Sequence, residues 1–144
     1  AAQGANVAFG TIRQDTGLPV EVTADNLSVD QATGTAIFTG NVLIGQGEMR
    51  LSASRVLVVY RANGDGIARL EATGGVTLVS GPDAAESERA DYDIDKGTIV
   101  MSGNVLLAQG RNALSSDTMS VKLSDGTAQM SGRVRTVLQP GGNN

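Results

Sequence analysis

The segment Gly97–Val105, with the sequence GTIVMSGNV, decides the fold because the chain repeats it. It returns as GTAIFTGNV at Gly34–Val42 and as GTAQMSGRV at Gly126–Val134, and a degenerate copy covers Ala68–Val76. The second glycines of the copies stand at positions 40, 74, 103 and 132, so the intervals are 34, 29 and 29 residues. Such spacing is typical of a chain built from one repeated supersecondary unit.

Apolar and polar residues alternate within these repeats and between them. Ala90, Tyr92 and Ile94 share one parity, and the residues between them are acidic. Alternation of this kind predicts half-buried strands of an antiparallel sheet. Asp125-Gly126, between two such runs, is a strong hairpin signal. We therefore predict eight runs of roughly ten or more residues, joined as hairpins.

Most predicted runs contain a small residue or a change of parity near the middle. After Ala24, Ala53 and Ser116 the apolar parity shifts by one residue, which is what a β-bulge produces. The repeat glycines have the parity of the apolar face, so we expect them to point inward at a crease. Each run would then pass from one sheet into a facing one, which predicts an all-β, antiparallel two-sheet jelly roll of about sixteen short strands. The composition is compatible with two arrangements. Either the sheets close tightly around small residues, or they splay and leave an apolar groove.

The composition excludes several classes of function. The 144 residues include no histidine and no cysteine, so Ser-His and Cys-His nucleophiles, disulfides and Cys/His zinc sites are excluded. A net charge of −4 argues against nucleic-acid binding through a basic face. The longest apolar run is Val56–Tyr60, whereas a membrane-spanning helix needs about twenty residues. These exclusions remove many catalytic mechanisms and the common zinc sites, and leave open chemistry based on carboxylates.

Two local patterns resemble binding motifs without completing them. Counting from Asp91, Lys96 and Ser102 stand where an EF-hand loop needs a glycine and a carboxylate. We therefore interpret Asp91–Asp95 as a solvated strand face. The segment Gly45-Gln46-Gly47 lacks the third glycine and the helix of a dinucleotide-binding motif, so it is interpreted as a turn.

Longer segments resemble one protein family closely. Pro19–Val29, with the sequence PVEVTADNLSV, and Thr35–Val42, with the sequence TAIFTGNV, are similar to the LptA/OstA family of periplasmic lipopolysaccharide-transport proteins of Gram-negative bacteria. Gln46-Gly47, Ser102–Val105 and Arg135–Leu138 also resemble that family, and the similarity covers about Phe9 to Pro140. The resemblance implies a half-open, V-shaped β-jelly roll that carries lipopolysaccharide acyl chains from the inner to the outer membrane. It also implies a protein that is not an enzyme and uses no metal or other cofactor, with LptC at the inner membrane and LptD at the outer membrane as partners.

The candidate lipid-binding residues come from two sources. Those that match the lipid-contacting positions of the family are Thr16, Val20, Val22, Leu78 and Ile94. For an arbitrary β domain the inward apolar stripe would be simple core, but the resemblance implies that part of it lines the groove. That stripe comprises Val20, Val22, Phe38, Val42, Ile44, Val76, Leu78, Tyr92, Ile94, Ile99, Met101, Val105 and Leu107.

The two ends of the chain differ from its middle. We expect residues 1–17 to be a mobile segment or an edge strand, residues 18–138 to form the jelly roll, and residues 139–144 to be a disordered tail. The start Ala1–Gly4 is similar to a mature chain after signal-peptide cleavage, which fits export to the periplasm. In the family the end strands join one copy head-to-tail to the next, and the residues predicted to do so are Val20, Val22, Val134, Thr136 and Leu138.

Other functions remain as alternatives. LptC and the N-terminal domain of LptD share the architecture, but the first would need a membrane helix and the second a large barrel, and neither is visible in these residues. A structural β-repeat filament protein is a further alternative. A β-helix enzyme acting on carbohydrates is disfavoured, because the Asp125-Gly126 hairpin signal does not suit parallel coils.

Overall fold

The computed structural model describes residues 5–8, 18–64, 66–138 and 140 of the chain. Within these residues every regular element is a β-strand, and no helix is long and apolar enough to cross a membrane. The strands are β1 (Ala5–Ala8), β2 (Glu21–Thr23), β3 (Asn26–Asp30), β4 (Thr35–Gln46), β5 (Met49–Tyr60), β6 (Ile67–Ser80), β7 (Asp83–Asp93), β8 (Thr98–Gln109), β9 (Asn112–Lys122), β10 (Thr127–Ser131) and β11 (Arg135–Val137).

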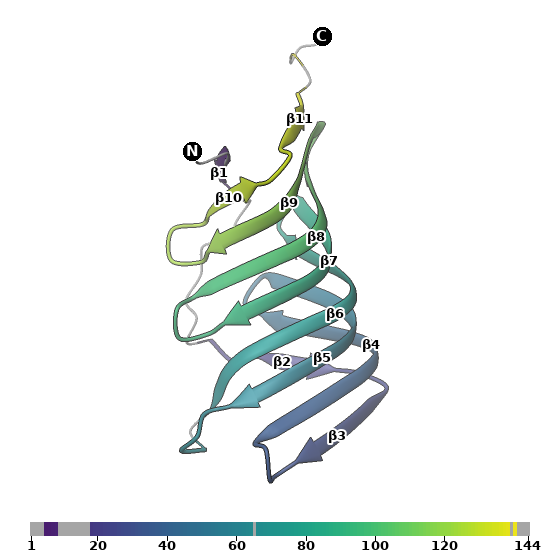
Figure 1. Cartoon of the computed structure of the whole chain (residues 1–144), viewed down its shortest axis with the longest axis vertical. Coiled ribbons are helices and arrows are strands. Elements are labelled where there is room, and N and C mark those ends of the chain that lie inside the picture. Colours follow the sequence, from purple (N-terminus) through teal and green to yellow (C-terminus); the bar gives the residue numbers. More distant parts are fainter. Residues whose placement is uncertain (1–4, 9–17, 65, 139, 141–144) are drawn as a thin grey trace.

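All pairings are antiparallel and belong to one continuous sheet, whose strands stack along the long axis of the molecule (Figure 1). The order is β1-β10-β9-β8-β7-β6-β5-β4-β2, while β11 pairs with β9 and β3 pairs with β4. From β4 to β10 each strand therefore lies beside its neighbour in sequence. One end of the stack is formed by β2 and β3, and the other end by β1 and β11.

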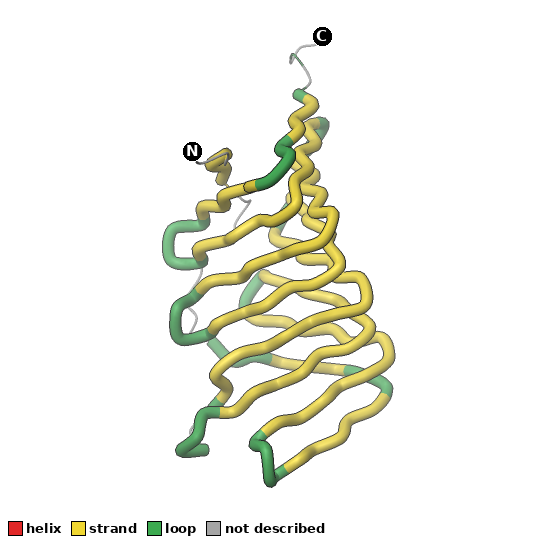
Figure 2. The backbone as a smooth tube through the Cα atoms, in the orientation of Figure 1, coloured by secondary structure: helices red, strands yellow, loops and turns green. Residues whose placement is uncertain are grey.

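The strands β4 to β9 are 11 to 14 residues long, and each folds back on itself at one side of the molecule (Figure 2). The sheet is thereby divided into two facing arms. In the short-turn arm, two-residue turns at 47–48, 81–82 and 110–111 join the strands. In the long-turn arm, the connections 31–34, 61–66, 94–97 and 123–126 have four or six residues.

The predicted fold class is confirmed by this arrangement. Strands β2 and β3 are the two halves of one further bent run, and β10 and β11 are the two halves of another. In each case the two strands flank a bend and lie in different arms. With β4 to β9 this gives eight bent runs, which is the predicted number. Their sixteen arms match the predicted strands, and β1 is an additional strand outside them.

Each bend in a glycine-bearing run is a bulge made of two residues with positive φ. Gly103 and Asn104 have φ angles of 86° and 52°, and both lie opposite a single residue of β9. Glycine adopts this backbone region without steric cost, and asparagine tolerates it better than most residues. The four bends of this kind are formed by Gly40 with Asn41, Gly74 with Gly75, Gly103 with Asn104, and Gly132 with Arg133.

The prediction that these glycines point inward is wrong. A Cβ placed on Gly103 would lie 2.8 Å from Cβ of Glu88, an exposed residue of the preceding run. The vacant position therefore faces the convex outer surface. Two consecutive residues with positive φ break the alternation on which the inward prediction depended. The same close approach occurs at Gly40, Gly74 and Gly132, with Asp25, Ser54 and Asp117 respectively.

The residues that approach the glycines also brace the bends. Nδ2 of Asn104 donates a hydrogen bond of 2.8 Å to Oε2 of Glu88, and Nδ2 of Asn41 donates one of 3.0 Å to Oδ2 of Asp25. Arg133 binds Asp117 with an N···O distance of 2.7 Å. A side chain from the preceding run thus holds the bulge on the outer face, and the device is repeated along the sheet.

The core lies between the two arms and is aliphatic. All four methionines of the chain are buried in it, at positions 49, 101, 119 and 130. Methionine is flexible and fills irregular gaps, which compensates for the scarcity of large aromatic side chains. Each fully buried side chain of this kind contributes about 1.5–3 kcal/mol of transfer free energy. In the middle of the molecule the space between the arms is therefore filled by side chains and closed to water.

Candidate functional site

The inner faces of both arms form apolar rows that run across the whole stack. Residues that pair across neighbouring strands share a face, so the pairing register defines each row. One row of the short-turn arm comprises Val22, Ile44, Leu51, Leu78, Ala85, Leu107, Leu114 and Thr136. One row of the long-turn arm comprises Leu27, Phe38, Val56, Ala72, Ala90, Met101, Met119 and Met130.

The structure brings the predicted stripe together on this inner surface. Val20, Val22, Phe38 and Ile94 are partly buried and pack against the core. Thr16 lies outside the described residues. The buried members of the stripe, each at most 2% exposed, are Val42, Ile44, Val76, Leu78, Tyr92, Ile99, Met101, Val105 and Leu107.

The inner surface is open where the stack begins. Leu27 and Val29 of β3 pair with Phe38 and Ala36 of β4, so their side chains belong to the inner face. They are nevertheless 56% and 60% exposed. Their exposure was not predicted from the sequence, although the parity shift after Ala24 places both residues on the inner face. An apolar interior that reaches solvent in this way is accessible to a ligand or to another protein chain.

The other end of the stack carries the remaining predicted interface residues. Val134 is partly buried, whereas Thr136 and Leu138 are exposed. In the described part of the chain, β2 and β11 each pair with one strand only, and both belong to the short-turn arm. In the long-turn arm β1 pairs with β10 at this end. The two predicted joining strands are thus edges of the same arm at opposite ends of the molecule.

The interior also contains buried polar groups, and those of Tyr92 and Gln46 are joined to each other. The hydroxyl of Tyr92 donates a hydrogen bond of 2.6 Å to Oε1 of Gln46, and Nε2 of Gln46 donates one of 2.9 Å to the backbone oxygen of Leu18. Burial raises the pKa of Tyr92 to about 12, and the hydrogen bond to Gln46 offsets only part of that effect.

The interpretation of Gln46 as a turn residue needs correction. Gln46 is the last residue of β4 and is 1% exposed, and the turn is formed by the next two residues. The glycines on either side of Gln46 obscured its role. Its parity, continuous with Val42 and Ile44, was the signal that places it inside.

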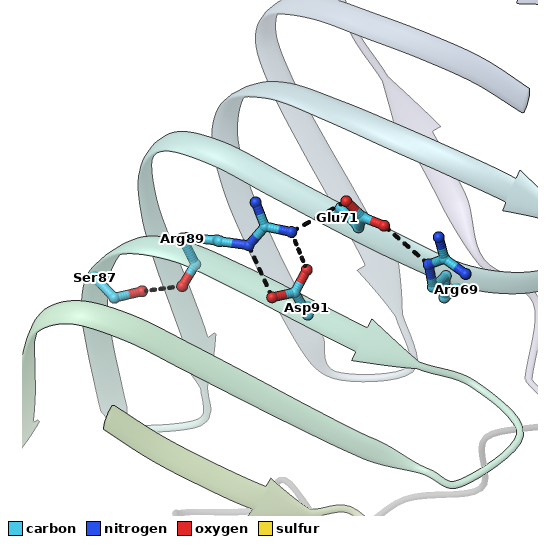
Figure 3. Close-up of polar contacts among 5 residues, drawn as sticks. All are labelled: Arg69, Glu71, Ser87, Arg89 and Asp91. Carbon is cyan, nitrogen blue, oxygen red and sulfur yellow. Dashed lines mark hydrogen bonds and ion pairs between the residues drawn. The ribbon is translucent and has the colours of Figure 1, made fainter. Parts of the chain in front are cut away.

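The outer face carries a network of ion pairs. Arg89 donates from Nη2 to Asp91 at 2.9 Å and to Glu71 of the neighbouring strand at 3.1 Å, and Arg69 binds the other oxygen of Glu71 at 2.9 Å (Figure 3). The hydrogen bond and charge of Asp91 raise the pKa of Arg89. Among the described residues no three acidic side chains gather as a metal site. Asp91 therefore belongs to a solvated ion-pair network. The predicted strand face ends at Asp93, because Asp95 lies in the connection 94–97.

Comparison with known proteins identifies relatives of this chain. An uncharacterised protein of Rhizobium meliloti is 32% identical over 90 residues, which cover 58% of this chain and 48% of that protein. The lipopolysaccharide export system protein LptH of Pseudomonas aeruginosa is 32% identical over 65 residues, or 45% of this chain and 37% of LptH. LptA of Escherichia coli is 33% identical over 61 residues, or 42% of this chain and 32% of LptA. The matched segments span less than half the length of these relatives.

The structural match and the family match agree with each other. The crystal structure of LptH, described as the LptA homologous periplasmic component of the lipopolysaccharide transport device of Pseudomonas aeruginosa, superposes with a TM-score of 0.77 at 18% identity. The superposition covers 88% of this chain and 99% of the LptH chain, which shows a common fold. Residues 21–129 match the family described as "LptA/(LptD N-terminal domain) LPS transport protein". Because this match covers most of the sequence, the chain belongs to the LptA/LptD N-terminal domain family of lipopolysaccharide transport proteins.

Proposed function

We propose that the chain acts in the periplasm as a carrier of lipopolysaccharide, sheltering its acyl chains between the two arms on the way from the inner to the outer membrane. The observation that carries this proposal is the apolar inner surface, which extends from β2 and β3 to β10 and reaches solvent at Leu27 and Val29. The role is binding and transfer, without catalysis.

The energetics of the interior suit such a ligand. Each methylene group moved from water into an apolar interior gains about 0.8 kcal/mol, so a few buried acyl chains suffice for stable binding. The net charge of −4 gives no overall attraction for anionic sugars and phosphates, which would stay in water. Binding would then rest on the acyl chains.

The residues proposed to contact lipid fall into two groups. Val20, Val22, Phe38 and Ile94 lie at the margins of the core and would meet an entering acyl chain first. The fully buried residues of the stripe would line its path once the arms move apart. Thr16 is proposed as a contact on the family resemblance alone.

Photocrosslinking tests this proposal directly. A photoreactive amino acid at Val22 or Ile94 is expected to label lipopolysaccharide in cells, whereas one at Asp93 is not. Asp93 is a matched control because it is the last residue of β7, directly before Ile94, and shares the outer parity of Asp91, whereas Ile94 packs against the core. Equal labelling at Ile94 and Asp93 would contradict the proposal.

We further propose that copies of the chain join head-to-tail, with LptC and LptD as partners at the two membranes. A strand can add to an unpaired sheet edge through backbone hydrogen bonds. Because β11 and β2 are edges of the same arm, β11 of one copy can continue that arm into β2 of the next. A contact of this kind does not close on itself, so it gives a ladder of oligomers.

Truncation tests the joint. Removing the residues after Arg133 deletes β11 and should leave a folded monomer in light-scattering experiments over a broad concentration range. The control removes only residues 139–144 and keeps β11, so it should assemble like the intact chain. Unchanged oligomers after the longer truncation would show that β11 is not the joint.

The family match also favours a second candidate, because it includes the N-terminal domain of LptD. Such a domain has the same fold but receives lipid at one end of an assembly. The light-scattering experiment separates the two candidates. Open-ended assembly supports a bridge component, and a constant monomer mass supports a terminal receiving domain.

A further inference from the structure

A hydrogen bond joins the two arms across the interior. Tyr92 belongs to β7 in the long-turn arm, and Gln46 belongs to β4 in the short-turn arm. Their side chains meet at 2.6 Å. These strands are separated in the sheet by β5 and β6, so the contact is made across the space between the arms and does not follow the strand pairing.

The surroundings make this bond an all-or-none contact. Tyr92 is 2% exposed, and its pairing neighbours in the sheet, Leu70 and Ile99, are apolar. A buried hydroxyl or amide that loses its partner without gaining water is strongly disfavoured. The pair is therefore stable when both groups meet, or when the arms separate far enough for water to reach both.

The pair lies at a position from which it can control the angle between the arms. Gln46 is the last residue before the turn at 47–48, at the tip of its arm, and Tyr92 is the second-last residue of β7. Both lie on the far side from the bends. The bulges at the bends are the irregular points of the sheet, where a change in arm angle disturbs the strand pairing least. Contact at the tips therefore controls the angle most effectively.

A second contact fixes the amide of Gln46 in the right orientation. Its Nε2 donates to the backbone oxygen of Leu18, which leaves Oε1 directed to the hydroxyl of Tyr92. The acceptor is thus held in place before the tyrosine meets it. Such preorganisation reduces the entropy lost when the bond forms.

We propose that Tyr92 and Gln46 form a latch that holds the arms together in the lipid-free protein and opens when acyl chains enter. This inference rests on the proposed lipid-carrier function and adds the groups that control access to the interior. Closing the latch keeps water away from the apolar side chains packed between the arms. Opening it exposes the buried stripe to the ligand.

Spin-label distances can report the opening. The chain has no cysteine, so Glu48→Cys and Lys96→Cys would place one label on an exposed turn of each arm. Pulsed electron paramagnetic resonance should give one short distance in the lipid-free protein. Adding lipopolysaccharide should produce a second, longer distance.

Variants of the latch test its role without lipid. Tyr92→Phe removes the donor, and Gln46→Met removes the acceptor at similar volume. Each should raise the ratio of open to closed molecules by roughly fivefold, the equivalent of about 1 kcal/mol for one hydrogen bond. Tyr60→Phe is the matched control because Tyr60 is the other tyrosine of the chain and is exposed. It should leave the distances unchanged.

The outcomes separate the latch from the proposed function. If both latch variants fold, by circular dichroism, and keep the wild-type distances, the latch is overturned. It is also overturned if lipopolysaccharide binds to the wild-type chain without producing the longer distance. If lipopolysaccharide fails to bind at all, the carrier function fails, and the lipid-free distances of Tyr92→Phe and Gln46→Met still decide whether the pair holds the arms together.

Discussion

Inner positions of β3 and β5 carry similar residues and have very different environments. Leu27 and Val29 of β3 are 56% and 60% exposed, whereas Val56 and Val58, in the same rows of β5, are at most 1% exposed. The residues are equally apolar, so chemistry does not explain the difference. It arises because β5 has a strand on each side and β3 pairs with β4 alone among the described strands.

The comparison shows that burial in this fold depends on position in the stack. Every inner residue needs both the facing arm and a neighbouring strand on each side to exclude water. Among the described residues β3 has a neighbouring strand on one side only, and its inner apolar side chains reach solvent there. Proteins usually protect such an edge, and exposed apolar side chains beside one fit the proposed entry of a ligand.

The strongest test places the same charge at both kinds of position. Met101→Asp puts a carboxylate in the closed middle and should cost more than about 4 kcal/mol, enough to unfold the domain. Val29→Asp should cost less than about 1 kcal/mol, because the side chain already reaches water. Urea denaturation followed by circular dichroism measures both. Equal losses would mean that β3 is covered in solution.

The next test concerns the bends that keep the middle closed. Gly103→Val should cost several kcal/mol, since valine is strained at a φ of 86° and its Cβ would meet Glu88. Ser102→Val, at the neighbouring paired position, is the control and should be mild. The free energy of unfolding is the measurement. If Gly103→Val left the free energy of unfolding unchanged, the bulge would not be needed to keep water out of the middle of the molecule.

A smaller effect should appear in the pH dependence of stability. The pKa of Tyr92 is about 12 in the folded protein, against 10.0 for ordinary tyrosine. Between these values the unfolded chain loses the proton and the folded chain keeps it, so stability falls as pH rises, by about 2–3 kcal/mol in total. The contribution is complete below pH 10. Tyr92→Phe should show a shallower decline in urea denaturation across this range, and identical declines would mean that water reaches Tyr92.

The smallest effect is expected on the outer face. Arg89 is paired with Asp91 and Glu71, but its side chain is 46% exposed. Arg89→Ala should therefore cost less than about 1 kcal/mol, and high salt should remove most of the difference. Thermal unfolding at low and high salt measures it. A loss comparable with that of an inner residue would mean that the outer charges hold the arms in shape.

The sequence predicted the runs, their bends and their hairpins because these features depend on local rules. Alternation reports which face a strand residue takes, and Gly126 or Gly103 marks where extended backbone is interrupted. The direction of the repeat glycines was not predictable from parity. Counting alternate residues assumes extended backbone, and the pairs such as Gly103 with Asn104 violate that assumption.

The closed interior and the polar pair depend on long-range packing. Whether two sheets close is decided by how well side chains fill the space between them, and the fit of Met101 or Met119 cannot be inferred from composition. Gln46 and Tyr92 are 46 residues apart, so only the folding of one arm over the other brings them together. The inner parity of both was visible in the sequence, and their contact was not.

Because the bend is repeated, the number of hairpins determines the length of the molecule. Neighbouring strands lie about 4.8 Å apart, so one extra hairpin would lengthen the stack by about 10 Å. Each glycine-bearing bend is braced by the run just before it, as Gly103 is by Glu88, so a duplicated hairpin would bring its own brace. The cross-section would stay the same. A fold of this kind can therefore be adapted to a wider or narrower gap between two surfaces by whole hairpins, without redesign of its interior.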